Sequence, residues 1–164
     1  MPQPVPLTPD DALAAPPHGR LWPDTARVDA AGRLLEGRCE GIGLSSGRFS
    51  VRDATGRVLT ESLAFCRDHA EAAGRMLDWL SRDPNNQPLD AAGHRIVHGG
   101  LRYVTPERIT PAMETELGRL SRLDPEHLSQ ELSIIHTVRA AHPQLPQVAC
   151  FDTAFHRTLP AVAR

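Results

Sequence analysis

The stretch VACFDTAFHRTLP, residues 148–160, is the part of the sequence that most constrains the fold. It opens with an apolar run bounded by Pro146 on one side and by Asp152 and Thr153 on the other, which is typical of a buried strand. Open α/β sheets bind ligands at the carboxyl ends of their strands, so Asp152 would present a carboxylate at that edge. An aspartate before a threonine is also a common helix N-cap, and the stretch alone favours that interpretation.

A second stretch, GHRIVHGG, covers residues 93–100. Its β-branched residues predict a short strand over Arg95–His98 that runs into a turn at Gly99 and Gly100. Within such a strand, and without further information, Arg95 is expected to form a structural ion pair. His98 is expected to hydrogen-bond the backbone of the turn.

Local patterns predict the remaining elements in the order antiparallel meander, helix, strand, two helices and strand. The meander is expected over residues 33–63, with a turn at Asp53–Gly56. Apolar residues at helical spacing predict helices over residues 68–81, 110–122 and 128–141. The second of these begins with Thr110 as its cap, and the last strand is expected over residues 148–151. This order predicts an α/β fold with a mixed sheet and flanking helices.

The amino-terminal segment differs in composition from the rest of the chain. Residues 1–26 contain seven of the 15 prolines, which remove backbone donors and fix φ, so an extended and weakly ordered arm is expected there. Residues 27–164 are expected to form the body of the protein. With 164 residues and 40% hydrophobic content, the chain suits one globular domain or a piece of a larger protein.

Charge excludes several classes of function. The net charge is -2 and no basic block is present, so neither nucleic acid nor an anionic membrane is expected as a partner. All 18 basic residues are arginine, which excludes Schiff-base chemistry and a phosphate loop that depends on lysine.

The cysteines and the termini indicate the compartment. Cys39, Cys66 and Cys150 are widely spaced and form no Cys-x-x-Cys pair, as expected of reduced thiols. The chain has no basic and apolar leader and no run of 18 apolar residues, so a soluble cytoplasmic protein is expected. His94 and His156 have no carboxylate or thiol at ligand spacing, which disfavours a zinc site.

The two stretches together, GHRIVHGG at residues 93–100 and FDTAFHRTLP at residues 151–160, resemble the acetate kinase family, which includes propionate and butyrate kinases. The resemblance extends from about Arg27 to Arg164 and is strongest after Gly93. It implies the ribonuclease H-like fold of actin and the sugar kinases, of which residues 27–164 would be an incomplete N-terminal domain. The resemblance also makes an active-site role the preferred interpretation of Asp152, ahead of a helix N-cap.

The family transfers a phosphoryl group between ATP and a short carboxylate, usually acetate, to give ADP and an acyl phosphate, with Mg²⁺. Carried over, Arg95 would hold the substrate carboxylate and then the transferring phosphoryl group, because a guanidinium matches both anions bidentately. Val97 would line a small apolar pocket for the methyl group of acetate. Asp152 would be the catalytic aspartate near magnesium. His127 aligns with a family histidine near the active site, although its neighbours, such as Glu126, differ from the family pattern.

Other parts of the family pattern have no counterpart in this chain. The family opens with a hairpin of the form Asn-x-Gly-Ser-Ser-Ser-x-Lys that binds ATP phosphates, and only Gly43–Phe49 is superficially similar. Much of the adenosine pocket and of the family's homodimer interface would lie beyond Arg164. We therefore expect a family member that binds ATP incompletely and is inactive alone. The alternatives are one half of a split kinase and a non-catalytic carboxylate- or phosphate-binding module.

Overall fold

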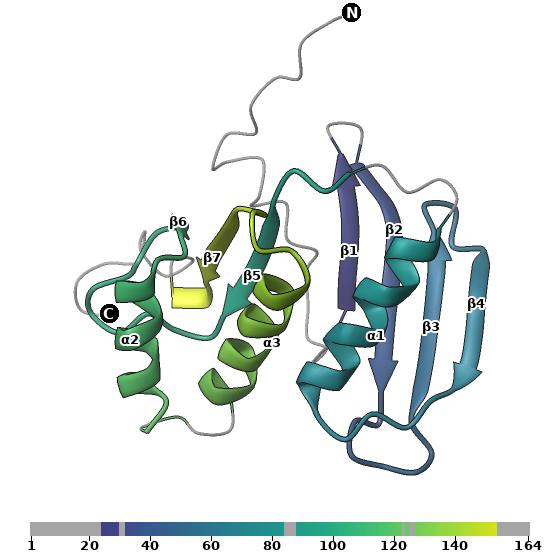
Figure 1. The fold of residues 1–164 in the computed structure, drawn as a ribbon, viewed down its shortest axis with the longest axis horizontal. Helices are drawn as coiled ribbons and strands as arrows, with labels where there is room; N and C mark the ends of the chain where they lie inside the picture. Colours follow the sequence, from purple (N-terminus) through teal and green to yellow (C-terminus); the bar gives the residue numbers. More distant parts are fainter. Residues whose placement is uncertain (1–23, 30–31, 84–87, 123, 125–126, 154–164) are drawn as a thin grey trace, which may run out of the picture. The chain divides into compact units, whose positions relative to one another are not determined.

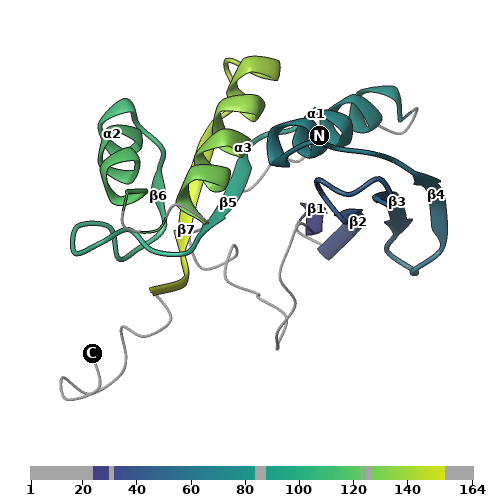
Figure 2. The ribbon, with the colours of Figure 1, turned by 90° about the horizontal axis from the view of Figure 1, so that it is seen from below.

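The computed structural model describes residues 24–29, 32–83, 88–122, 124 and 127–153 (Figures 1 and 2). The chain divides into two compact units, Met1–Asp68 and His69–Arg164. The first unit is all-β in its described part, and the second combines helices with a small sheet. Each is considered by itself.

The first unit contains an antiparallel sheet of four strands in the order β1-β2-β3-β4 (Figure 1). The strands are β1 Asp24–Asp29, β2 Gly32–Glu40, β3 Arg48–Asp53 and β4 Val58–Leu63. The pairing of the last three confirms the meander predicted over residues 33–63. Strand β1 was missed and includes residues 24–26 of the predicted arm, because the last of the seven early prolines is Pro23 and the following residues can all donate to a ladder.

The predicted turn between β3 and β4 forms as expected. The Asp53 carboxylate accepts hydrogen bonds from the Thr55 hydroxyl at 2.6 Å, the Thr55 amide at 2.9 Å and the Arg57 amide at 3.1 Å. These bonds, that of the Thr55 hydroxyl first, lower the pKa of Asp53 to about 2. Gly56 adopts a φ of 84°, a conformation that glycine tolerates best.

In its described residues, the second unit contains three helices and a three-stranded mixed sheet in the order β5-β7-β6 (Figure 1). Its elements are α1 His69–Arg82, β5 Ala92–Ile96, β6 Glu107–Arg108, α2 Pro111–Leu120, α3 Leu128–Ala141 and β7 Gln147–Phe151. Strands β5 and β7 are parallel, and β6 is antiparallel to β7. The predicted mixed α/β fold is confirmed. None of the helices in the described part of the chain has the length and apolar character that a membrane span requires.

In this unit, the predicted bounds of the helices agree with the structure more closely than those of the strand after residue 94. Helix α3 has the predicted bounds, and α2 begins after Thr110, whose hydroxyl accepts the Met113 amide at 3.2 Å. The strand predicted over Arg95–His98 is wrong at both ends, because β5 begins at Ala92 and stops at Ile96. The next amide, that of Val97, donates to a side chain of α3 and not to a neighbouring strand.

The core of the second unit lies where α2 and α3 pack against one face of the sheet (Figure 2). The buried cluster consists of Ile96, Tyr103, Ile109, Met113, Leu117, Leu128, Ile135, Ala149 and Phe151. The rings of Tyr103 and Phe151 stack with their centroids 6.0 Å apart and their planes 13° from parallel. Because β5 and β7 each contribute to this cluster, packing fixes their common register.

Gly99 allows the chain to turn tightly against this core after β5. A Cβ atom at this position would lie 2.3 Å from the Tyr103 carbonyl oxygen and 2.9 Å from Cε1 of Phe151. Neither neighbour can move easily, because one is backbone and the other is a buried ring. The glycine is therefore required by packing.

We predict that Gly99→Ala lowers the free energy of unfolding by about 2 kcal/mol or more, because the added methyl group overlaps the Tyr103 backbone. Gly93→Ala is the matched control, since a Cβ there meets nothing within 4 Å. Urea denaturation of both variants measures the difference. Equal stability of the two variants would show that the turn at Gly99 is not constrained by the core.

Candidate active site

The topology brings residues from three elements to one edge of the sheet. Strands β5 and β7 run parallel (Figure 1). Arg95 lies beside Cys150 and Ile96 beside Phe151, so Val97 and Asp152 follow at the same carboxyl edge. Helix α3 leads directly into β7 and therefore runs antiparallel to it, which places its first turn at this edge. The edge thus collects polar side chains that are distant in the sequence.

The structure pairs two of the predicted site residues, Arg95 and Asp152. Nε of Arg95 donates to Oδ1 of Asp152 at 2.5 Å, and this hydrogen bond is the main cause of the raised pKa of Arg95. The side chain of Arg95 is 51% exposed and that of Asp152 is 37% exposed, although His94 and Ile96 on either side of Arg95 are buried. An ion pair this accessible contributes little to stability, about 0–1 kcal/mol. The pair is the one expected of an arginine in such a strand, and it leaves both side chains partly accessible at the edge of the sheet.

Val97 lies at the end of β5, where the predicted apolar pocket would be. It is half-buried and packs against the core of the second unit. Its backbone N–H donates to both carboxylate oxygens of Glu131, at 3.1 Å and 3.3 Å. The side chain of Val97 thus contacts the core, while its backbone is fixed by the Glu131 carboxylate.

Glu131 is a site residue that the sequence analysis missed. It lies in the first turn of α3, and burial raises its pKa to about 7 against the opposing effect of the Val97 amide. The negative charges of Asp152 and Asp124 raise the pKa further, and His127 lowers it. The sequence contained an indication of this burial, because the helical spacing places Glu131 on the same face of α3 as Leu128 and Ile135, which are buried.

Asp124 is the second residue that was missed, and it links two histidines. Its Oδ1 lies 2.9 Å from Nδ1 of the predicted site residue His127, and its Oδ2 lies 4.0 Å from Nε2 of His98. The hydrogen bond with His127 is the main cause of the lowered pKa of Asp124. The Gly100 amide donates to Nδ1 of His98 at 3.3 Å, so the ring proton of a neutral His98 is on Nε2, which faces Asp124.

We call the six side chains at this edge the edge cluster: Arg95, His98, Asp124, His127, Glu131 and Asp152. The cluster combines one permanent cation with two imidazoles and three carboxylates. The guanidinium can bind an anion, and the imidazoles and carboxylates near it can donate or accept protons. Glu126 and His156 lie outside the described residues.

The edge cluster provides only a partial site for magnesium. Among the described residues, no group of three or more histidine, cysteine, aspartate or glutamate side chains could hold a metal ion by itself. Magnesium commonly binds one or two carboxylates together with water and phosphate oxygens, so Asp152 fits such an ion only when phosphate is also present. His94 is used elsewhere, since its Nε2 lies 2.7 Å from Oε1 of the buried Gln147.

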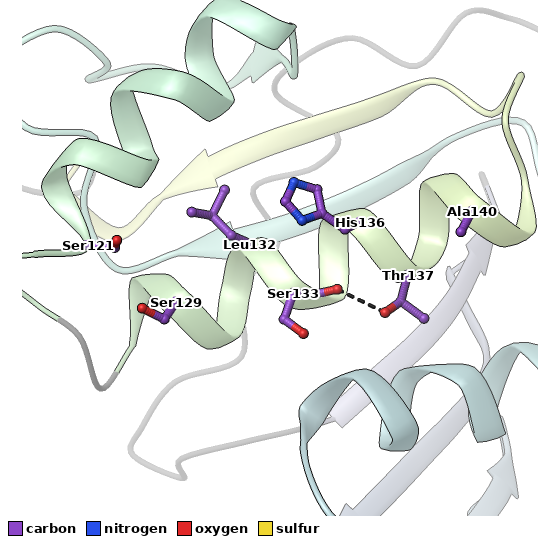
Figure 3. A pocket seen from close by; sticks show the side chains of 7 residues that line it. All are labelled: Ser121, Ser129, Leu132, Ser133, His136, Thr137 and Ala140. Atoms are coloured by element: carbon purple, nitrogen blue, oxygen red, sulfur yellow. Dashed lines mark hydrogen bonds between the residues drawn. The ribbon is translucent and has the colours of Figure 1, made fainter.

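A hollow of about 560 Å³ beside α3 is lined by residues other than those of the edge cluster (Figure 3). It is lined by Ser121, Ser129, Leu132, Ser133, His136, Thr137 and Ala140. The Thr137 hydroxyl donates to the Ser133 carbonyl at 2.9 Å, which is an ordinary bond within a helix (Figure 3). The hollow is wide open and lacks convergent charged groups, so the edge cluster is the better candidate for an active site.

Comparison with known proteins identifies similar chains. The sequence matches the model of the Acetokinase family over residues 25–164. It is 39% identical over 133 residues to an acetate kinase of Leifsonia xyli subsp. xyli, with 79% of this chain and 33% of that protein covered. It is 41% identical over 95 residues to an acetate kinase of Rhodopseudomonas palustris, with 58% of this chain and 24% of that protein covered.

Solved structures are also similar. The fold matches a crystal structure of Porphyromonas gingivalis acetate kinase with a TM-score of 0.72 and 26% identity, over 84% of this chain and 36% of that chain. It matches a propionate kinase from Francisella tularensis with a TM-score of 0.73 and 24% identity, over 85% of this chain and 36% of that chain. These likenesses confirm the predicted actin and sugar kinase fold. The chain spans about a third of the length of the curated relatives that cover most of it.

The raised pKa of Glu131 predicts a pH-dependent stability. The native protein keeps the proton up to about pH 7, whereas the unfolded chain loses it near the ordinary value of 4.5. Ionisation therefore destabilises the native state as pH rises between these values, by on the order of 2 kcal/mol for a partly buried group. Glu131→Gln should remove this contribution.

Two measurements check this prediction. The Glu131 carboxyl carbon should titrate with a midpoint of about 7 in ¹³C NMR, with Glu131→Gln providing the assignment. Denaturation curves should show the stability of Glu131→Gln increasing relative to wild type as pH rises from about 4.5 to about 7. A midpoint at the ordinary glutamate value, together with a constant stability difference, would contradict the assigned environment.

Proposed function

This chain belongs to the Acetokinase family, and on that premise we propose that its edge cluster is the carboxylate-binding side of a phosphotransferase site. The reaction would transfer the γ-phosphoryl group of ATP to a short carboxylate such as acetate. The observation that carries the proposal is the exposed pair of Arg95 and Asp152 at the carboxyl edge of β5 and β7. A cytoplasmic location forms part of the same proposal.

Arg95 and Val97 would bind the acceptor. A guanidinium has five N–H donors, so the bond from Nε to Asp152 can coexist with a bidentate bond from Arg95 to a carboxylate. The side chain of Val97 would contact the alkyl part of the acceptor. Each additional methylene group would change selectivity by only about 1–3 kcal/mol, so several short carboxylates could be accepted.

The transfer step requires no general base. A short carboxylic acid is ionised at neutral pH, and its carboxylate oxygen can attack the γ-phosphorus directly. A bond forms between that oxygen and phosphorus, the bond from phosphorus to the β,γ-bridging oxygen breaks, and ADP leaves. Arg95 would stabilise the negative charge on the phosphoryl oxygens, and alignment of this kind supplies most of the catalysis in phosphoryl transfer.

Asp152 would act by orientation and charge. Its hydrogen bond fixes the guanidinium of Arg95. Asp152 would also lie near the magnesium ion that accompanies ATP and that neutralises phosphate charge when bound. His127, held by Asp124, would contribute a donor close to the acceptor.

We predict that Arg95→Ala weakens the binding of acetate and of inorganic phosphate at least about tenfold, because it removes the only permanent cation of the edge cluster. Arg119→Ala is the matched control, since Arg119 is an exposed arginine of α2 that pairs with Glu116. Titrations followed by NMR or calorimetry compare the variants. If both variants bind acetate as wild type does, Arg95 is not the carboxylate-binding residue.

We also propose that the 164-residue chain does not complete the reaction alone. The chain has no lysine, and one guanidinium with one carboxylate supplies only part of the rate acceleration of a typical enzyme, about a millionfold or more. The purified chain with ATP, Mg²⁺ and acetate should therefore give no acyl phosphate that hydroxylamine can trap. Robust turnover would overturn this part of the proposal, and turnover only after a second polypeptide is added would favour a split kinase.

A further inference from the structure

Glu131 is a partly buried acid of the edge cluster that the proposed reaction does not use. Its carboxylate accepts the Val97 amide with both oxygens, across 34 positions of sequence. The ladder between β5 and β7 ends at the pair of Ile96 and Phe151, so Val97 is the first residue of this segment beyond the sheet. Glu131 therefore provides the hydrogen-bond acceptor at the point where strand pairing stops.

This contact fixes the backbone next to the anion site. Val97 follows Arg95 by two positions, so both side chains depend on the path of the same short segment. A strand end that has lost its ladder partner would otherwise be free to fray. The Glu131 carboxylate, which accepts the Val97 amide with both oxygens, restrains this segment and does not cover the guanidinium of Arg95.

The charge of Glu131 also acts on whatever binds at Arg95. The charged groups that interact with Glu131 come from three parts of the chain: Arg95 from β5, Asp152 after β7, and Asp124 and His127 before α3. An anion bound to Arg95 would share this environment and would be repelled by the Glu131 carboxylate. Coulomb energy is proportional to the charge of the anion, so a dianion is repelled twice as strongly as a monoanion.

We propose that Glu131 is a positioning and selectivity residue of the anion site, which fixes the end of β5 through the Val97 amide and, by its negative charge, favours monoanions over dianions. This inference rests on the proposed function, because it takes Arg95 to be the group that binds the anion. A short carboxylate is a monoanion. The site would thereby select the acceptor against free sulfate and phosphate.

The test compares acetate and sulfate binding to wild type and Glu131→Gln by NMR or calorimetry. Glutamine retains a side-chain oxygen that can accept the Val97 amide but carries no charge. At about pH 8 the substitution should strengthen acetate binding about threefold and sulfate binding about tenfold, since doubling the anion charge squares the factor. Glu116→Gln, which changes a partly buried acid of α2 that pairs with Arg119, should change neither affinity.

The pH dependence separates a charge effect from a merely structural one. Acetate and sulfate keep their charges between about pH 6 and about pH 8.5, whereas Glu131, with its pKa raised to about 7, loses its proton in this range. Sulfate affinities of wild type and Glu131→Gln should therefore converge at the acid end and diverge at the alkaline end.

The positioning role has its own readout. Hydrogen exchange of the Val97 amide should remain slow in Glu131→Gln and become faster in Glu131→Ala, which has no acceptor. If Glu131→Ala does not fold, the charge test on Glu131→Gln still decides the proposal. Equally slow exchange in a folded Glu131→Ala would overturn the positioning role.

The possible failures are distinguishable. If wild type binds acetate and Glu131→Gln shows the same preference for acetate over sulfate at every pH, the selectivity role is wrong and the proposed function stands. If neither variant binds acetate or sulfate, and Arg95→Ala behaves in the same way, the proposed function and the inference that rests on it both fail.

Discussion

The parallel pairing of β5 with β7 is the constraint on which the rest of the second unit depends. It brings Arg95 and Asp152, which are 57 positions apart, into one hydrogen bond at the carboxyl edge of the sheet. The same pairing requires the intervening chain to cross back over the sheet, and α3 is the last part of that crossing. The first turn of α3 consequently lies at the same edge and contributes Glu131.

Packing maintains this arrangement from the opposite face of the sheet. Ile96 and Phe151 are buried one residue away from the exposed pair, and Ile135 of α3 joins them in the core. Because side chains alternate along a strand, the residues that fix the register and those that face a ligand are neighbours in the sequence. Any slip by one position would exchange the two faces, so an intact core and an intact edge cluster are expected together.

Much of this could be predicted from the sequence, but not all of it. Helix α3 and the cap at Thr110 follow local rules, and the structure confirms them. The hydrogen bond between Arg95 and Asp152 is a finding of the structure. The carboxyl end of β5 could not be predicted, because it depends on a hydrogen bond from a helix that is distant in the sequence. Glu131 lies on the buried face of α3, but its contact with Val97, 34 positions away, is defined only by the tertiary fold. Asp124 was missed although His127 follows it by three positions, and its second partner, His98, is brought near only by the fold. The roles of Arg95, Val97, His127 and Asp152 towards a ligand remain predictions.

The central claim is that a short carboxylate binds between Arg95 and Val97 at this edge. Intermolecular nuclear Overhauser effects from ¹³C-labelled acetate to the protein test it most directly. The account predicts contacts from the acetate methyl group to the Val97 methyl groups, with the Arg95 Nε–H resonance shifting on binding. Acetate that binds but shows its contacts to Ser133 and Thr137 in the hollow beside α3, and none to Val97, would contradict the account.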